Sequence, residues 1–379
     1  MRHMKKTLLF ASICCLAFAG CGKSNEETPE NTEELLVLET ETEITVEPET
    51  ETETETEAVE DLGSRGLLTG EPVDEVVAHM RPVSCMVGNT TDAMPQYGIS
   101  NADVIVEAPA EGGLTRIMPI FQDYRELPTI MSQRSCRHYF AYLSNEFDSI
   151  YVHYGQAIYA TEMLKSMDDL NGLDGDLENV TFYRDSSRKS PHNAYINGDS
   201  IQAGIDKREY RTTLPDGFQH YIFAKDGEEV TLDNGEAAVV VEPGFPVNKP
   251  WFEYDESTGL YKRFQYKSAH IDGGNGEQLA FKNIIFRVCD YKMEPDNKYL
   301  DVKTATYDQL RPGKYITNGK AIDITWTKSV EDGKPHYFDA DGNELVINQG
   351  KTCVCIVLDD SVEKMGVYAS KSEFEAARE

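Results

Sequence analysis

The sequence predicts a protein of mixed α/β and α+β class, with a layered α/β domain over residues 66–213 and a smaller β domain over residues 214–379. In the first part, short apolar runs alternate with stretches of helical periodicity, which is typical of layered α/β folds. In the second part, short β-rich runs are separated by turn residues, which favours a mostly antiparallel sandwich or open barrel. The stretch "LPDGF" at residues 214–218 marks the joint between the two parts.

The N-terminus predicts a signal peptide over residues 1–20. A basic head that includes Arg2, Lys5 and Lys6 precedes the apolar run "TLLFASICCLAFAG", which is too short and wrongly flanked for a membrane-spanning helix. Cys21 follows at once, and "FAGC" is close to a lipobox, in which the cysteine becomes the lipid-modified first residue. Phe18 is bulkier than the usual residue of that motif, so simple secretion is the alternative.

A disordered linker is expected over residues 21–65, behind the lipidated cysteine. Residues 24–61 contain sixteen acidic residues and no Lys or Arg, so they account for more than half of the net charge of −30. Alternating Glu and Thr cannot bury enough apolar surface to fold, and like charges extend the chain. The following body is also acidic, which argues against nucleic acid as a partner because phosphate-backbone binding needs clustered cations.

The elements of the first domain follow from local patterns. Residues 82–89 and 149–155 read as short buried strands, and residues 103–121 read as two strands joined by a turn at Gly112 and Gly113. Apolar spacing predicts helices over residues 135–147, 156–167 and 197–210, the first with Ser135 as a plausible N-cap.

The second domain is predicted from β-rich runs and hairpin turns. The turns "ESTG", "TNGK" and "DGNE" lie between such runs and fit hairpins. The runs cover residues 220–230, 237–244, 250–264, 279–291, 314–328, 335–347 and 351–358.

Five cysteines remain in the body, an odd number without metal-ligand spacing, which favours buried and inert thiols over disulfides or zinc ligands. Cys353 and Cys355 lie two residues apart in "TCVCIVL", so in a strand they share one face. No metal site or cofactor is predicted.

Several long motifs resemble one family. The stretches "RPVSCMVGNTTDAMPQYGISNADVIVEAPAEGGLTRIMPIF", "QRSCRHYF", "FDSIYVHYG" and "FYRDSSRKSPHNAY" are similar to the successive signatures of the YerB-like bacterial lipoproteins, and the likeness covers nearly the whole body. The resemblance implies a two-domain protein at the extracytoplasmic face of the cell membrane, held by a lipid (palmitate) anchor. It implies no reaction and no catalytic residues.

Two positions depart from the family pattern. Cys353 stands where a Trp usually follows Gly-Lys-Thr, which affects packing. Gly88 stands where several members have an acidic residue, so a site that used a carboxylate there would be altered.

Polar residues of the first domain fall at predicted strand ends and helix starts, where layered α/β folds place ligand sites. Arginine binds carboxylate and phosphate groups bidentately. We therefore expect a cleft for an anionic cell-envelope ligand, either a polymer or a small molecule. Its candidate residues are Arg116, Arg134, Arg137, Arg184, Asp185, Arg188, Lys189, His192 and Asn193. The alternative is that the Arg and Glu residues form ion pairs that hold loops together.

A hydrolase is the second interpretation. Glu107 or Glu111 as general acid or base, with His153 or His192 nearby, would suit hydrolysis of a wall glycan or phosphodiester. The chain has no nucleophile, zinc-protease or P-loop motif, and His153 also fits an interior histidine. The sequence therefore leaves enzymatic activity uncertain and favours binding.

A protein-interaction module is the third interpretation, although no particular protein partner is predicted. Six aromatic residues surround the hairpin at residues 250–266, and alternation could expose some of them to a partner or glycan. Core packing is the alternative. The six are Trp251, Phe252, Tyr254, Tyr261, Phe264 and Tyr266.

Overall fold

A twelve-stranded mixed sheet runs through the computed structural model, which describes residues 63–378. The predicted signal peptide, Cys21 and most of the linker lie outside the described residues. Across the sheet the strands are β11 (Glu236–Ala237), β21 (Lys320–Lys328), β20 (Tyr307–Thr317), β17 (Asn283–Cys289), β24 (Thr352–Leu358), β3 (Val104–Pro109), β4 (Thr115–Phe121), β1 (Val83–Cys85), β6 (Ile150–His153) and β7 (Asp169–Asn171), with β2 (Val87–Gly88) paired to β4 and β22 (Pro335–Phe338) paired to β21.

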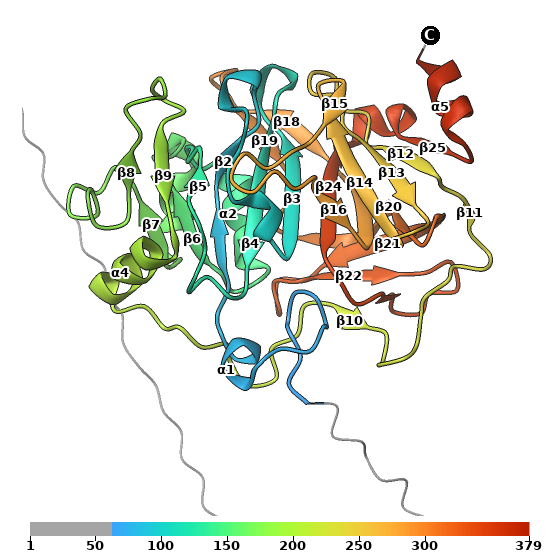
Figure 1. The fold of residues 1–379 in the computed structure, drawn as a ribbon, viewed down its shortest axis with the longest axis horizontal. Coiled ribbons are helices and arrows are strands. Elements are labelled where there is room, and N and C mark those ends of the chain that lie inside the picture. Colours follow the sequence, from blue (N-terminus) through green and yellow to red (C-terminus); the bar gives the residue numbers. More distant parts are fainter. Residues whose placement is uncertain (1–62, 379) are drawn as a thin grey trace, which may run out of the picture. The chain divides into compact units, whose positions relative to one another are not determined.

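The sheet joins the two predicted domains. β24, near the C-terminus, pairs in parallel with β17 on one side and with β3 on the other. In Figure 1 the teal strand β3 of the first part and the orange-red strand β24 of the second meet at this point. The mixed fold class and the largely antiparallel second part are confirmed. Strands from both sides of the predicted boundary between residues 213 and 214 belong to this one sheet.

The hairpins predicted at Gly112 and Gly113, at "ESTG" and at "TNGK" form. The turn "DGNE" is instead closed by a single isolated bridge, because β22 before it pairs with β21 and the strand after it pairs with residues 222–223. β3 and β4 are joined by a turn in which Gly112 and Gly113 have φ of 73° and 74°, a conformation that glycine adopts without steric cost. β20 and β21 are joined through Asn318 and Gly319, both with positive φ, as a two-residue hairpin turn requires.

A second, six-stranded sheet is antiparallel and belongs to the C-terminal part. It contains β15 (Ser268–Ala269), β14 (Leu260–Gln265), β13 (Trp251–Asp255), β12 (Val240–Glu242), β25 (Gly366–Tyr368) and β16 (Ala280–Phe281). Three small sheets complete the strands: β10 (Ile222–Phe223) with β23 (Val346–Ile347), β18 (Tyr291–Met293) with β19 (Leu300–Val302), and β5 (Ile130–Met131), β9 (Ala194–Ile196) and β8 (Tyr183–Arg184) together.

The helices are short. The α-helices are α1 (Glu75–Ala78), α2 (His138–Asn145), α3 (Thr161–Leu164), α4 (Gly198–Arg208) and α5 (Lys371–Ala377), and the 3-10 turns are η1 (Thr91–Ala93), η2 (Ile99–Asn101), η3 (Glu111–Gly113), η4 (Ile158–Ala160) and η5 (Asp359–Lys364). α4 confirms its prediction and begins with a capping box formed by Asn197 and Ser200.

The predicted cap of α2 is wrong. The helix begins after Arg137, whose side chain does not cap it, and Ser135 Oγ instead donates to the carbonyl of Tyr154 at 3.1 Å. Ser135 precedes the first helical residue by three positions, which is why the sequence pattern indicated it as the cap. In the structure its hydroxyl bonds another segment of the chain instead. The helix predicted over residues 156–167 is also shorter, because η4 precedes the single turn of α3.

The body cysteines are buried and free, as predicted. Cys353 and Cys355 pack in the same apolar cluster, whereas their neighbours Val354 and Ile356 pack in the cluster on the other face of the sheet. Burial raises the pKa of Cys136 and Cys289 to about 12. These thiols are therefore poorly suited to act as thiolate nucleophiles or metal ligands.

Candidate functional site

The segment 184–193 connects β8 and β9 and is held by its own polar contacts. The backbone N–H of Asp185 donates to the carbonyl of Asn193 at 2.8 Å, and the Arg184 guanidinium donates to the Asn193 side chain at 2.9 Å. Arg184 also lies 4.6 Å above the ring of Tyr154. Ser187 donates to Asp185 through its hydroxyl and its backbone N–H, and both bonds lower the pKa of Asp185. Asp185 and Asn193 therefore shape this loop.

Arg188 and His192 extend from the same segment. The Arg188 guanidinium donates to the carbonyls of Met94 and Pro95 at 2.9 and 3.0 Å. His192 is half-buried, and its buried Nδ1 has no hydrogen-bond partner. Burial, followed by repulsion from Arg134, lowers the pKa of His192. Lys189 in the same segment is exposed.

Gly88 adjoins both Arg116 and Arg134. Gly88 is the ladder partner of Arg116, and a Cβ atom built on Gly88 would lie 3.1 Å from Cγ of Arg134. The Arg116 guanidinium donates to the carbonyl of Ser135, and Arg134 donates to the carbonyl of Pro191 at 3.3 Å. Burial, together with repulsion from Arg137 and Arg134, lowers the pKa of Arg116 to about 10. Three guanidinium groups therefore lie close enough to repel one another.

Arg137 differs from these arginines because it has an acidic partner. Its guanidinium donates to both oxygens of Glu111, each at 2.8 Å. Burial alone would raise the pKa of Glu111, but Arg137 outweighs it and holds the pKa below its usual value. Glu111 also lines a cavity of about 360 Å³ between the β3–β4 turn and segments of the C-terminal part.

Ion pairing separates the arginines into two sets. Fourteen arginines lie within residues 63–378, and ten of them form an ion pair with a carboxylate. The four described arginines without such a pair all belong to the predicted site: Arg116, Arg134, Arg184 and Arg188. We call these four the unpaired arginines.

Glu107 lies in a fully buried polar network. One of its oxygens accepts hydrogen bonds from Asn89, Thr115 and Asn248, at 3.0, 2.6 and 2.7 Å. The other oxygen lies 2.6 Å from the guanidinium of Arg263, which is also fully buried. A carboxylate with this many partners and no exposed surface is poorly placed to act on a large substrate.

His153 is likewise an interior residue. It is fully buried, and its ring nitrogens contact the carbonyl of Gly155 at 2.9 Å and the Asp169 carboxylate at 3.0 Å. The sequence had left an interior histidine and a catalytic base both open, and this geometry matches the interior histidine.

Two buried groups were missed by the sequence analysis. Arg263 and His270 are hydrogen-bonded to each other beside Glu107, and burial lowers the pKa of His270 well below its usual value. In β14 buried residues alternate with half-buried ones, and Arg263 falls at a buried position. This alternation is the only signal that could have indicated the burial of Arg263.

The second missed group lies around Glu146, which contacts Arg287 at 2.8 Å and Lys328 at 2.9 Å. Burial alone would raise the pKa of Glu146, but the two cations outweigh it and lower the pKa to about 2.

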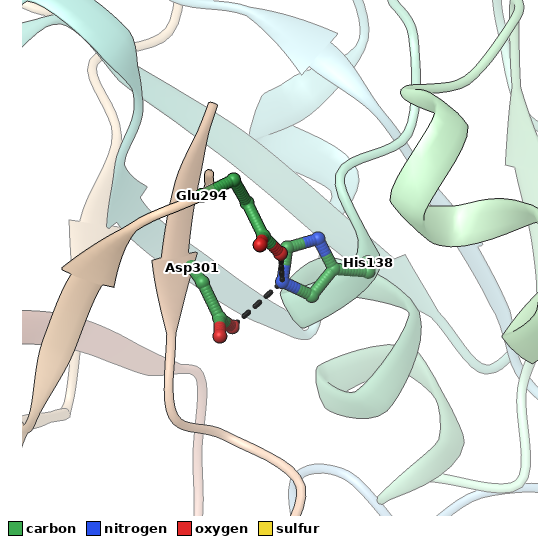
Figure 2. Close-up of side chains that lie close together, drawn as sticks. All are labelled: His138, Glu294 and Asp301. Atoms are coloured by element: carbon green, nitrogen blue, oxygen red, sulfur yellow. Dashed lines mark hydrogen bonds and ion pairs between the residues drawn. The ribbon is translucent and has the colours of Figure 1, made fainter. Parts of the chain in front are cut away.

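A histidine and two carboxylates form a further polar group that the sequence analysis missed. His138 begins α2, whereas Glu294 and Asp301 come from the β18–β19 hairpin, and Figure 2 shows both carboxylates directed at the histidine ring. Their ligand atoms all lie within 4.8 Å of one another. The absence of a metal site was inferred from spacing along the chain, and these residues are too far apart in sequence to give a spacing motif.

Most of the aromatic residues around the β13–β14 hairpin pack against other residues of the protein. Phe252 and Tyr261 are fully buried, Trp251 is 9% exposed, and the other three are half-buried. Trp251 stacks on Phe264 at 4.9 Å and contacts Phe374 of α5. This packing matches the core alternative and offers little surface for an aromatic binding patch.

Two family models match the two parts of this chain. Residues 68–211 match the family model described as the N-terminal domain of a protein of unknown function (DUF3048), and residues 241–354 match the corresponding C-terminal domain. The chain is 32% identical over 300 residues to "Putative lipoprotein YerB" of Bacillus subtilis (strain 168), a match that covers 77% of this chain and 86% of the relative.

A solved structure shows the same fold. The crystal structure of the YerB protein from Bacillus subtilis aligns with a TM-score of 0.71 at 28% identity and covers 80% of this chain and 99% of that one. The chain therefore belongs to the YerB-like family of two-domain lipoproteins. Within residues 63–378, no helix has both the length and the apolar character needed to span a bilayer.

Proposed function

We propose that this chain is a lipid-anchored lipoprotein at the extracytoplasmic face of the cell membrane, where it binds an anionic group of a cell-envelope ligand. The lipobox-like "FAGC" at residues 18–21 and the acidic linker that follows support the anchor. The name of the Bacillus subtilis relative, a putative lipoprotein, supports the same location.

The unpaired arginines carry the proposal for the ligand. In this acidic body ten arginines have carboxylate partners, whereas Arg116, Arg134, Arg184 and Arg188 contact only carbonyl oxygens, an amide oxygen or aromatic rings. Arg116, Arg134 and Arg188 are partly buried, and a guanidinium group that is partly withdrawn from water without a counter-charge is destabilised, a cost that an anion would relieve. Arg184 is exposed, so an anion would gain only a charge-assisted hydrogen bond from it. An anionic ligand would take the place that a carboxylate has beside the other arginines.

The hydrogen-bonding geometry of arginine indicates which anionic groups the ligand carries. A guanidinium fork matches the oxygens of a phosphate or carboxylate group, both of which occur on wall polymers and peptides. The body is otherwise acidic, so a polyanion would be repelled at long range and attracted only near the unpaired arginines. Binding should therefore weaken at high salt, which screens exposed charges.

Binding is favoured over hydrolysis because both candidate carboxylates and one of the two candidate histidines are already occupied, although Nδ1 of the other, His192, has no partner in the described chain. Glu107 and His153 are buried and hydrogen-bonded, and Glu111 is held by Arg137. The hydrolase alternative requires turnover of wall fragments by the wild-type chain and loss of that turnover in Glu111→Gln.

Retention on isolated cell walls tests the proposal. Arg134→Ala and Arg184→Ala should each reduce retention, because each removes an unpaired guanidinium. Arg125→Ala is the matched control, since it removes the same charge from an exposed arginine that is paired with Asp123. Equal retention of all three variants and the wild type would overturn the proposal.

A further inference from the structure

His138 presents a nitrogen to two carboxylates at the junction of the two parts of the chain. Its Nε2 lies 2.7 Å from Oδ1 of Asp301 and 3.8 Å from Oε1 of Glu294, and Figure 2 marks both contacts. His138 is only 7% exposed, whereas the two acids are half-buried on the β18–β19 hairpin. The histidine is thus anchored in the body, and the hairpin carries both acids to it.

The donor set suits a divalent transition metal. One imidazole nitrogen and two carboxylate oxygens are ligands for Zn²⁺, whereas Mg²⁺ and Ca²⁺ prefer oxygen alone. A tetrahedral zinc ion with bonds of about 2.1 Å places its donor atoms about 3.4 Å apart. The two separations from His138, 2.7 and 3.8 Å, lie on either side of this value, and all three donor atoms lie within 4.8 Å of one another, so modest movements of the side chains would give the required geometry.

A cavity provides access to these three residues. It has a volume of about 420 Å³ and is lined by His138, Glu294 and Asp301 together with Tyr142 and Tyr159 from the first part of the chain. Three protein ligands beside an open cavity leave a coordination position for water or a ligand, which is the arrangement of catalytic rather than structural zinc sites.

We propose that His138, Glu294 and Asp301 bind one divalent transition-metal ion, with zinc the best match to this donor set, and leave a coordination position open to the cavity. This inference is independent of anion binding by the unpaired arginines. The site is nevertheless connected to that region, because Glu111, the partner of Arg137, accepts a hydrogen bond at 3.4 Å from the backbone of Leu300 in the same hairpin.

Lys292 competes with a metal ion for the Asp301 carboxylate. Its ammonium group lies 3.2 Å from the second oxygen of Asp301, but the side chain is 71% exposed and can turn into solvent. An exposed ion pair of this kind contributes little to stability. The two carboxylates carry more negative charge than Lys292 neutralises, so a divalent ion is the better counter-charge.

Zinc titration of the full chain, after removal of metal by a chelator, tests the site. Isothermal titration calorimetry with ZnCl₂ should show one tight equivalent per chain in addition to any weak binding by the acidic residues 24–61. Glu294→Gln should weaken the tight phase more than about tenfold, because even outer-shell changes cost 10–100-fold in metal affinity. The weak phase should be unchanged, since the linker is the same in both proteins.

Three further variants make the result decisive. Asp301→Asn should act like Glu294→Gln, and both alter a surface hairpin that the fold tolerates better than a change at the buried His138. Glu256→Gln, at an exposed hairpin turn elsewhere, is the matched control and should retain the tight equivalent. Absence of a tight equivalent from the wild type, or its persistence in both hairpin variants, would overturn the proposal.

X-ray absorption at the zinc edge should report nitrogen and oxygen ligands without sulfur, and should lose the nitrogen in His138→Gln.

Discussion

Two sets of arginines in this molecule differ in the partners they have. Arg263 and Arg287 are fully buried and face Glu107 and Glu146 directly, so these charges are matched inside the protein. The unpaired arginines lie at the strand ends and loops around Gly88 and residues 184–193, where no carboxylate is within ion-pair distance of them in the described chain. The first set therefore holds the fold together, and the second set is the one that we propose binds an external anion.

The largest loss of stability is expected when buried cations lose their carboxylate partner. Glu146→Gln leaves Arg287 and Lys328 buried without an anion, and breaking a buried pair in this way costs about 3–5 kcal/mol. Urea unfolding should show this loss of stability. Glu236→Gln, which removes an exposed partner of Lys314, should cost less than about 1 kcal/mol. Equal losses in the two variants would contradict the structural role of the buried network.

Glu107→Gln should also destabilise the fold, by about 3 kcal/mol, since Arg263 would then lack its counter-charge. Glu111→Gln should cost less, about 1 kcal/mol, because its pair with Arg137 is partly exposed to water. Calorimetric unfolding of both variants would compare them. A stable Glu107→Gln protein that had lost turnover of wall fragments would instead favour the hydrolase interpretation.

Buried histidines should make the protein sensitive to mild acid. Burial lowers the pKa of His220 to about 3 and lowers that of His270 well below its usual value. The unfolded chain takes up a proton on each near pH 6.5, but the folded chain does not, so stability must fall as the pH drops below about 6.5. Between pH 7.5 and 5.5 the loss should be about 1 kcal/mol per histidine.

Urea unfolding at these two pH values checks the acid sensitivity. His220→Gln should reduce the pH dependence, and an unchanged pH dependence in this variant would show that His220 is not the cause. At lower pH a second loss is expected as Glu146 is protonated, because its folded pKa of about 2 is below the unfolded value.

The smallest effect on stability is expected at the unpaired arginines. Arg134→Ala and Arg184→Ala should change the free energy of unfolding by less than about 0.5 kcal/mol, because neither breaks an ion pair. Their effect should appear in wall retention instead. A loss of 2 kcal/mol or more in either variant would mean that these arginines support the fold as the buried set does.

Local sequence patterns predicted most elements but not their partners. The hairpin at Gly112 and Gly113 and the capped helix α4 follow from short stretches of sequence and are confirmed. The pairing of β24 with β3 joins segments about 250 residues apart, and nothing local to either strand specifies it. For the same reason the sequence indicated arginine-rich segments but could not show that Glu107 would meet Arg263.

The position of Gly88 offers the most direct test of the central claim. In Gly88→Asp the new carboxylate would be carried by the ladder partner of Arg116, beside the Arg134 side chain, where it would supply an internal counter-charge, whereas Gly88→Asn adds a side chain of the same shape without the charge. Retention of both variants on isolated cell walls should be compared at low salt, together with their stability. We predict that Gly88→Asp loses retention and that Gly88→Asn keeps most of it. Equal retention of the two variants would contradict the account, because the free positive charge of the unpaired arginines would then have no part in binding.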